Sequence, residues 1–214
     1  AYRSHHLASE AWNKGYFADQ VVNYEVKGKK GAATLVDMDD SVRSDCSMDS
    51  LAKLKPVYEG GIVTAGNSSP QNDAASAVLI MTREKAKELG LEILAKVTGF
   101  ASAGVDPNIM GIGPVYSTRK LLQKHGLKLE DIDLIELNEA FAAQSIPCIR
   151  ELGIDIDRLN VNGGAIAIGH PLAASGGILV ARLVHEMKRR DAKRGLVTFC
   201  CGGGQGFSVL FERD

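Results

Sequence analysis

The 214-residue sequence lacks several features that would place it in a specialised class. Its net charge is −1, so no overall electrostatic field draws it toward nucleic acid or an anionic membrane. No apolar run approaches the roughly 18 residues that a membrane-spanning helix needs. There is no signal peptide, but the sequence opens on Ala1 in a helical pattern, so this absence carries little weight. With 45% apolar and 24% charged residues, the composition is that of an ordinary soluble globular protein.

Cysteine is also scarce, and the spacing of the four cysteines excludes two kinds of chemistry. No cysteine or histidine pair has zinc-ligand spacing, so no metal site is expected. Two of the cysteines are adjacent in the sequence, and neighbouring cysteines cannot easily form an unstrained disulfide. A reducing, cytoplasmic compartment is therefore favoured. The four cysteines are Cys46, Cys148, Cys200 and Cys201.

The first 90 residues contain short elements separated by irregular chain. Apolar residues recur at helical spacing in residues 1–14, which predicts a helix. A strand follows and turns back at the "KGKK" sequence of residues 27–30, which predicts a hairpin with a solvated turn. Residues 37–60 are polar and irregular, and residues 61–90 end in a helix that Gly90 terminates.

Residues 91–214 alternate between strands and helices, which predicts a layered α/β domain. Pro114 lies near the first turn of one predicted helix, where proline is tolerated, whereas Pro147 is expected to interrupt another. The last two strands are expected to pair antiparallel, because the turn that joins them is very short. The strands are predicted at residues 94–105, 131–138, 159–164, 195–201 and 207–213, and the helices at residues 114–126, 140–153 and 171–190.

Three turns of this domain are expected to follow strand ends and to carry reactive side chains: Asn138-Glu139, Gly169-His170-Pro171 and Cys200-Cys201-Gly202. Ligand sites in open α/β sheets collect at the carboxyl ends of the strands. An amide, an imidazole and a thiol are therefore expected to converge on one site. The glycines after Cys201 do not form a phosphate-binding loop, because Lys-Ser/Thr does not follow them.

Two of these residues could also have purely structural roles. His170 precedes the long predicted helix, whose dipole disfavours a protonated ring, so a neutral imidazole could accept a proton or donate an N–H. It could equally be a capping histidine with a structural duty. Cys200 could be an inert core thiol. The glycines beside it favour chemistry instead, because they weaken the strand and let a backbone approach another group.

Several motifs, in order along the chain, resemble the thiolase family, the acyl-CoA acetyltransferases. They are "TAGNSSPQND" at 64–73, "GVDPNIMGIGPV" at 104–115, "NEAFA" at 138–142, "NVNGGAIAIGHPLAASGG" at 160–177 and "CCGGGQG" at 200–206. The resemblance spans nearly the whole chain. It implies the layered α-β-α-β-α thiolase fold, with acyl-CoA as substrate and no permanently bound cofactor.

The resemblance also implies catalytic roles. His170 would activate a nucleophilic cysteine and donate an N–H to the thioester oxygen, and Asn138 would hold the water that completes this oxyanion site. Cys200 would be the acid/base that moves the proton at the carbon nucleophile or at the departing acetyl group, and the N–H of Gly202 would help to bind a second oxyanion. Condensation needs both an acyl carrier and a separate base, which suits this division. Cys201 and Glu139 are interpreted as structural and supporting residues.

Five further residues match family positions that bind coenzyme A (CoA): Ser69 on the pantetheine arm, Ala65, Met110 and Phe141 along its tunnel, and Arg43 at the adenine–phosphate end. A guanidinium suits phosphate, although an exposed loop arginine often binds nothing. Three glycines common in the family are replaced here. Pro70 and Ala74 stand in the loop around Ser69, and Ala173 follows "GHPL".

The sequence offers no counterpart of the nucleophilic cysteine that thiolases carry in a Cys-x-Ser/Gly-Gly context. Cys46 lies in a polar loop, and Cys148 lies in a predicted helix. Residues 1–60 resemble the remainder of a loop domain, residues 61–90 the closing segment of an N-terminal domain, and residues 91–214 a complete C-terminal domain. Segment 61–90 should then expose Val78, Leu79 and Ile80 as a partner-seeking surface.

Two functions remain open at this stage. The first is the C-terminal part of an acyl-CoA acetyltransferase, catalysing thiolysis or Claisen condensation with a nucleophilic cysteine from a separate N-terminal chain. The second is a non-catalytic CoA-binding or assembly subunit derived from a thiolase. The resemblance also implies a homo- or hetero-oligomer. The altered loop at Pro70 favours the second function, and the complete set of Asn138, His170 and Cys200 favours the first.

Overall fold

The computed structural model describes residues 1–28 and 31–214. At its centre is a four-stranded sheet with the order β3-β6-β5-β4. Strand β6 pairs antiparallel with both of its neighbours, and β4 pairs parallel with β5. The predicted antiparallel pairing of the last two strands is therefore confirmed. The strands are β3 (Lys96–Gly104), β4 (Leu134–Leu137), β5 (Arg194–Cys201) and β6 (Gln205–Glu212).

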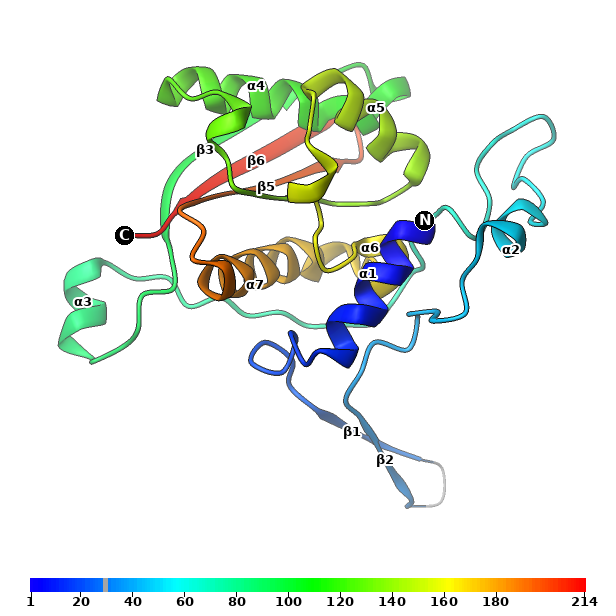
Figure 1. The fold of residues 1–214 in the computed structure, drawn as a ribbon, viewed down its shortest axis with the longest axis horizontal. Helices are drawn as coiled ribbons and strands as arrows, with labels where there is room; N and C mark the ends of the chain where they lie inside the picture. The colour runs from blue at the N-terminus through cyan, green and yellow to red at the C-terminus, as the bar shows by residue number, and fades with distance from the viewer. Residues whose placement is uncertain (29–30) are drawn as a thin grey trace.

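Helices cover both faces of this sheet and give a layered α/β domain (Figure 1). On one face lie α4 (Gly113–His125) and α5 (Ala142–Leu152), and on the other lie α7 (Leu172–Arg190), α6 (Ala165–Ile168) and α1 (Tyr2–Asn13). Short 3-10 turns complete the domain: η1 (Pro107–Ile112), η2 (Leu129–Asp131) and η3 (Ile156–Arg158).

The two faces of the sheet carry two separate apolar cores, as the period-two alternation of a strand requires. On β5, Leu196 points into the core that contains Leu121 of α4, whereas its neighbour Val197 packs with Leu183 and Met187 of α7. All five side chains are almost fully buried. The alternation fixes the register of β5, and therefore also fixes where Cys200 emerges at its end.

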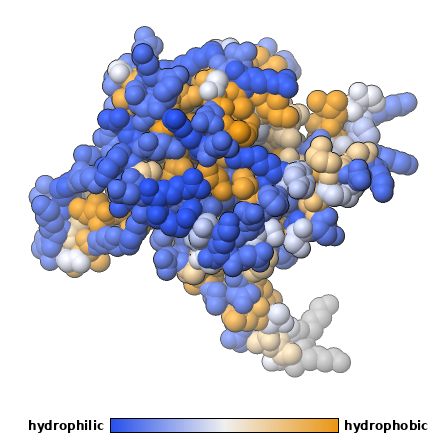
Figure 2. Space-filling view, in the orientation of Figure 1, coloured by the Kyte–Doolittle hydropathy of each residue, from blue (hydrophilic) through white to orange (hydrophobic). Residues whose placement is uncertain are grey.

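Residues 14–90 form arms around this domain (Figure 1). They contain the antiparallel hairpin of β1 (Tyr24–Lys27) and β2 (Ala33–Val36), and the short helices α2 (Met48–Ala52) and α3 (Arg83–Glu88). The hairpin is confirmed, but Lys29 and Lys30 of its predicted solvated turn lie outside the described residues. Apolar side chains are visible on the hairpin surface (Figure 2), where Tyr24 is 70% and Leu35 58% exposed.

The predicted exposure of the apolar segment before α3 is also confirmed. Val78 is 44% exposed, Leu79 75% and Ile80 76%. Large exposed apolar segments of this kind mark interaction surfaces. Within the described residues, no helix combines the length and the apolar character that crossing a bilayer would require.

The strand predicted at residues 159–164 is absent, and the side chain of Asn160 explains why. This segment makes only isolated bridges, one of them parallel to β4 through Ile135 and Leu159. Asn160 has a positive φ of 42°, which ends any extended run. Its amide accepts from the backbone N–H of Leu137 (2.9 Å) and donates to the carbonyl of the same residue (2.8 Å). One side chain thus supplies the hydrogen bonds to the backbone of Leu137 that a neighbouring strand would otherwise have made.

The interruption predicted at Pro147 is also wrong, because α5 runs continuously from Ala142 to Leu152. Tertiary packing overrides the local cost: Cys148, the next residue, is fully buried in the core beside α4. A proline inside a helix still removes one hydrogen bond and crowds the carbonyl four residues earlier.

We expect Pro147→Ala to raise the free energy of unfolding by about 1–2 kcal/mol. Relief of the helix penalty outweighs the greater freedom of the unfolded chain. Urea unfolding followed by circular dichroism measures the change, with Ala143→Ser in the same helix as a control for altered helix propensity. A less stable Pro147→Ala variant would mean that contacts of the proline ring matter more than the missing backbone bond.

Candidate active site

The carboxyl ends of β4 and β5 open into a cavity of about 430 Å³. Most of its walls come from four places: the turn after β4, the turn before α7, the end of β5 and the loop at residues 69–71. No wall residue carries a formal charge at pH 7, apart from any fraction of His170 that is protonated. The cavity therefore suits a neutral, largely apolar group. The lining residues are Ser69, Pro70, Gln71, Met110, Asn138, Ala140, Phe141, His170, Leu172, Ser175, Gly176, Phe199, Cys200, Cys201 and Gly202.

Asn138 is held at the end of β4 by a bond to the neighbouring strand. Its backbone N–H donates to the carbonyl of Thr198 on β5 (3.0 Å), which continues the parallel ladder by one residue. The residue is only 2% exposed. Its side-chain amide nitrogen lies 3.3 Å from Nε2 of His170. The amide and the imidazole therefore meet, as the sequence predicts.

His170 reaches the cavity from a helix junction rather than from a strand end. The sequence predicts a strand before it, but the structure places it between α6 and α7. Its Nδ1 lies 2.6 Å from the hydroxyl of Ser175, in the first turn of α7. A hydroxyl can donate or accept, so Ser175 can support either neutral tautomer of the ring. This lets Nε2 act as a proton acceptor in one state and as an N–H donor in the other.

The imidazole is kept neutral by its surroundings. Burial lowers the pKa of His170 below its ordinary value of 6.5, because the charged ring would lose hydration. The predicted direction therefore agrees with the structure. The sequence attributes this effect to the dipole of the following helix, whereas burial accounts for it here.

Cys200 is nearly the last residue of β5, and its thiol is buried. Burial raises the pKa of the thiol above its ordinary value of 9.0. Burial also raises the pKa of the adjacent, half-buried Cys201. Both sulfurs are therefore protonated at neutral pH, which suits a proton donor more than a resting thiolate.

Three of the glycines that follow Cys201 are required for physical reasons that differ from one position to the next. Gly203 and Gly204 both have φ of +88°, which only glycine adopts without strain. A β-carbon on Gly206 would lie 2.1 Å from the backbone of Gly113, so the turn packs directly on α4. Gly202 needs neither reason: its φ is not positive, and a β-carbon there would meet nothing within 4 Å. Gly202 faces open space in the cavity wall.

The loop around Ser69 is bonded to the turn after β4. The backbone N–H and the hydroxyl of Ser69 both donate to the carbonyl of Ala140, at 3.0 and 2.9 Å. Ser68 forms an antiparallel bridge with Phe141. Pro70 needs no N–H here, and its carbonyl accepts from the N–H of His170 (3.1 Å). The replacement of a family glycine by Pro70 is therefore compatible with an ordered loop.

Seven of the nine predicted site residues lie in this cavity. They are Ser69, Met110, Asn138, Phe141, His170, Cys200 and Gly202. Ala65 and Arg43 are exposed and do not line it. The backbone N–H of Arg43 donates to Nδ1 of His5 (3.2 Å), a buried residue of α1. An exposed arginine near no described cavity gives no structural reason to assign it a ligand.

The other two cysteines also lie outside the cavity. Cys148 is fully buried, and its pKa is raised to about 11 by burial. Its thiol donates to the carbonyl of Gly111 (3.3 Å), which is a structural contact. Cys46 is half-buried in the loop before α2, where burial again raises the thiol pKa. Neither has the low pKa of an activated nucleophile.

Sequence reasoning misses Ser175, Leu172, Phe199 and Gln71, which also line the cavity. Ser175 had a usable signal, because a residue in the first turn of a helix can face back to the residue before that helix. The others depend on tertiary packing.

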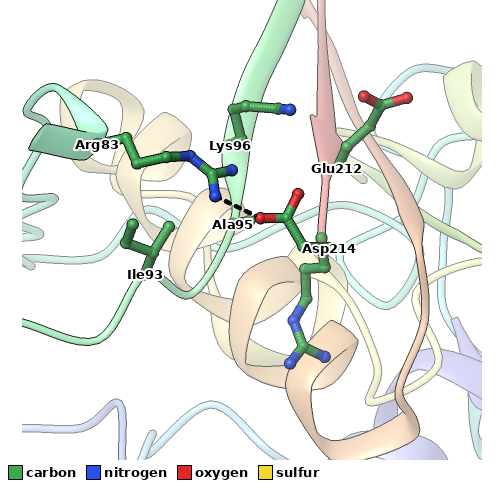
Figure 3. Close-up of a pocket in the computed structure, with 7 residues that line it drawn as sticks. Arg83, Ile93, Ala95, Lys96, Glu212 and Asp214 are labelled. Atoms are coloured by element: carbon green, nitrogen blue, oxygen red, sulfur yellow. Dashed lines mark ion pairs between the residues drawn. The ribbon is translucent and has the colours of Figure 1, made fainter. Parts of the chain in front are cut away.

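A second, smaller pocket of about 100 Å³ lies far along the sheet from this site (Figure 3). It forms where Lys96 begins β3 and Glu212 ends β6, whereas the Cys200 turn lies at the other end of β6. An ion pair between Arg83 and Asp214 (2.6 Å) borders it, with both side chains exposed. Exposed pairs of this kind contribute little to stability, and the residues that line the pocket include no cysteine, serine or histidine.

Comparison with known proteins agrees with this geometry. The family model described as "Thiolase, C-terminal domain" matches residues 91–213, and "Thiolase, N-terminal domain" matches residues 1–84. The chain belongs to the thiolase family. The two matches meet between residues 84 and 91. The finer division of residues 1–90 into loop-domain and N-terminal-domain parts stays a prediction.

The alignments with individual relatives include nearly all of this thiolase chain but only about half of each relative. An acetyl-CoA acetyltransferase of Pseudomonas aeruginosa is 53% identical over 99% of this chain and 54% of the relative. The crystal structure of the Bacillus anthracis acetyl-CoA acetyltransferase matches 98% of this chain, with a TM-score of 0.95 and 44% identity, over 53% of that chain.

Human mitochondrial 3-ketoacyl-CoA thiolase, solved in complex with CoA, matches 100% of this chain with a TM-score of 0.90 and 39% identity. The match covers 53% of the human chain. The chain therefore spans about half the length of the relatives it matches. The layered thiolase fold of this chain is shown by these structures.

Proposed function

We propose that this chain forms the acid/base half of an acyl-CoA acetyltransferase active site. It would act in thiolysis of 3-ketoacyl-CoA or in the reverse condensation. The observation that carries the proposal is the Asn138–His170 contact of 3.3 Å beside the buried thiol of Cys200, in a cavity without formal charge. A thioester and the pantetheine arm are neutral groups of matching character.

The residues divide the chemistry between them. His170 takes the proton from an attacking thiol and then donates an N–H to the thioester oxygen, with Ser175 supporting each tautomer. In thiolysis, the protonated thiol of Cys200 would give its proton to the α-carbon of the departing acetyl group and become a thiolate; in condensation, that thiolate would take the proton from the α-carbon of the second acyl group. Gly202 lines the cavity, and a β-carbon there would meet nothing within 4 Å, which leaves room for a substrate oxygen at its backbone N–H. Ser69, Met110 and Phe141 line the path for pantetheine.

The acylated cysteine is proposed to come from outside residues 1–214, either from another part of a longer polypeptide or from a separate N-terminal chain. Cys46 and Cys148 lie away from the cavity. The exposed segment of Val78, Leu79 and Ile80 supports this idea, because it offers an apolar surface beside the arms. Since both cavity cysteines must remain thiols, a reducing compartment such as the cytoplasm suits the reaction.

A CoA-binding or assembly subunit without catalysis is the second proposal. The observation that favours it is the bond between the hydroxyl of Ser69 and Ala140, because a serine already engaged has less freedom to bind pantetheine. The two proposals differ in what the Cys200 thiol does.

Protection of the cavity thiols tests the CoA binding on which the first proposal depends, and the turnover of Cys200→Ala in the complete enzyme separates it from the second. We expect acetyl-CoA to slow the labelling of Cys200 by N-ethylmaleimide by about tenfold or more, because a bound pantetheine arm occupies the same cavity. Peptide mass spectrometry quantifies the label at each cysteine, and Cys46 serves as the internal control. Equal labelling of Cys200 with and without acetyl-CoA would contradict CoA binding here. Native mass spectrometry on the same sample shows whether a second chain with a reactive cysteine accompanies this one.

A further inference from the structure

One short segment, residues 67–72, makes direct contact with both of the turns that carry Asn138 and His170. On the Asn138 side, Ser69 donates twice to the carbonyl of Ala140, and the N–H of Ala142 donates to the carbonyl of Asn67 (2.8 Å). These bonds extend over three residues on each side. They fix the turn that follows β4 as firmly as a short strand pair would.

On the His170 side, the same segment makes two different contacts. The carbonyl of Pro70 accepts the backbone N–H of His170 (3.1 Å). The side chain of Asn72 packs on Gly169, where a β-carbon would lie 2.2 Å from Oδ1 of Asn72. Gly169 has φ of +101°, so the backbone immediately before His170 is held in a conformation that other residues rarely adopt.

Asn72 is itself anchored to a third part of the chain. Its Nδ2 donates to the hydroxyl of Ser41 (2.9 Å). Its Oδ1 is buried and has no hydrogen-bond partner among the described residues. An unpaired buried oxygen costs stability, and such groups persist where the surrounding packing fixes them. The orphan oxygen lies against Gly169, next to the residue whose imidazole meets Asn138.

We propose that residues 67–72 act as a clamp that sets the spacing of Asn138 and His170, and that Asn72 is its positioning residue. The two side chains come from the end of β4 and from the junction between α6 and α7, and the clamp bonds to the turns at both places. Because Ser69 and Pro70 of the clamp also line the cavity, a ligand that contacts this wall presses on the segment that holds the imidazole. Ligand binding and imidazole placement are thereby coupled.

The catalytic importance of placing His170 rests on the proposed function. The test of the clamp does not, because it measures only the pKa of the ring. The groups within hydrogen-bond distance of the ring are the hydroxyl of Ser175 and the amide of Asn138, and the thiol-bearing Cys200 and Cys201 line the same cavity. None is charged at neutral pH, and burial alone lowers the pKa of His170. The titration of this ring therefore reports how well the clamp excludes water.

The experiment follows the ring resonances of His170 against pH by NMR, in the 214-residue chain and in Asn72→Ala. We expect the pKa of His170 to rise toward its ordinary value in the variant, because the loosened turn admits water to the ring. Loss of the resonance in His170→Asn assigns it. The matched control is Asn67→Ala in the same segment. It removes two side-chain hydrogen bonds, to Ile62 and Thr64, that do not involve the His170 turn.

Asn67→Ala should lower the melting temperature and leave the pKa of His170 unchanged. Ser41→Ala should move the pKa in the same direction as Asn72→Ala, and the double variant should move it no further, since both changes break one anchor. An unchanged pKa in Asn72→Ala would overturn the clamp, and an equal shift in Asn67→Ala would overturn the assignment of Asn72 as its positioning residue. If CoA fails to perturb His170 in the unaltered chain while Asn72→Ala still shifts the pKa, CoA binding fails and the clamp stands.

Discussion

Cys200→Ala is expected to lower the turnover of acyl transfer by about 10²–10⁴-fold, the usual contribution of a positioned general acid or base. The measurement uses the complete enzyme, with the segment or chain that supplies the acylated cysteine. Alanine keeps the apolar end of β5 and removes only the sulfur. Because Cys200 is one of several wall residues, the KM for acetyl-CoA should change by less than about threefold.

A second readout identifies the step that Cys200 serves. The methyl protons of acetyl-CoA should exchange with deuterated solvent in the unaltered enzyme, and Cys200→Ala should abolish this exchange. Acylation of the nucleophilic cysteine should survive in the same variant, since His170 performs that step. Cys46→Ser, outside the cavity, is the control and should retain both reactions. Turnover within tenfold of the unaltered enzyme in Cys200→Ala would remove the thiol from the mechanism.

Much of the layered domain is predictable because its signals are local. Pro114 lies in the first turn of α4, and Gly126 ends it in the left-handed conformation, so proline and glycine mark the two boundaries. The apolar alternation of β5 and β6 and the short turn between them require an antiparallel pair. The convergence of Asn138 and Cys200 follows too, because β4 and β5 are parallel neighbours and end at the same edge.

Other features depend on partners far away in the sequence. The failure of residues 159–164 to form a strand follows from the side chain of Asn160 bonding to Leu137, a relation that no local pattern contains. Pro147 is tolerated because burial of Cys148 outweighs the loss of a helical bond. The family resemblance, unlike periodicity, does not depend on the element before His170, which is a helix rather than the predicted strand.

A buried ion pair beneath the site gives the largest expected effect on stability. Arg182 of α7 is 4% exposed and Glu136 of β4 is 2% exposed, and Nε lies 3.4 Å from Oε2. The guanidinium also donates to the carbonyl of Gly163 and lies over the ring of Phe17. The Arg182 side chain therefore connects α7 with β4, with the loop before α6 and with Phe17 in the segment after α1. Glu136 is two residues before Asn138, so this pair supports the strand that delivers the amide.

Arg182→Met is expected to lower the free energy of unfolding by about 3–5 kcal/mol at pH 8, the usual cost of leaving one buried charge unpaired. Chemical denaturation measures it. The double variant Arg182→Met with Glu136→Leu should recover part of the loss, because no buried carboxylate remains to be desolvated. If the double variant is as unstable as Arg182→Met, the loss comes from packing and the Gly163 bond rather than from the unpaired charge.

The pH dependence separates these causes further. Burial raises the pKa of Glu136 from 4.5 to about 7, with Arg182 opposing the rise. The folded state then binds more protons than the unfolded state between these values. Stability from this group is therefore present below pH 4.5 and is lost as the pH rises toward 7, by about 3 kcal/mol at most.

Without Arg182, the pKa of Glu136 rises further, so the stability of Arg182→Met continues to fall above pH 7. The difference between the two proteins should be constant from pH 5 to 6.5 and should widen from pH 7 to 8.5, because only the variant still takes up a proton on folding. A difference that does not vary with pH would show that Arg182 does not act on Glu136 through its charge.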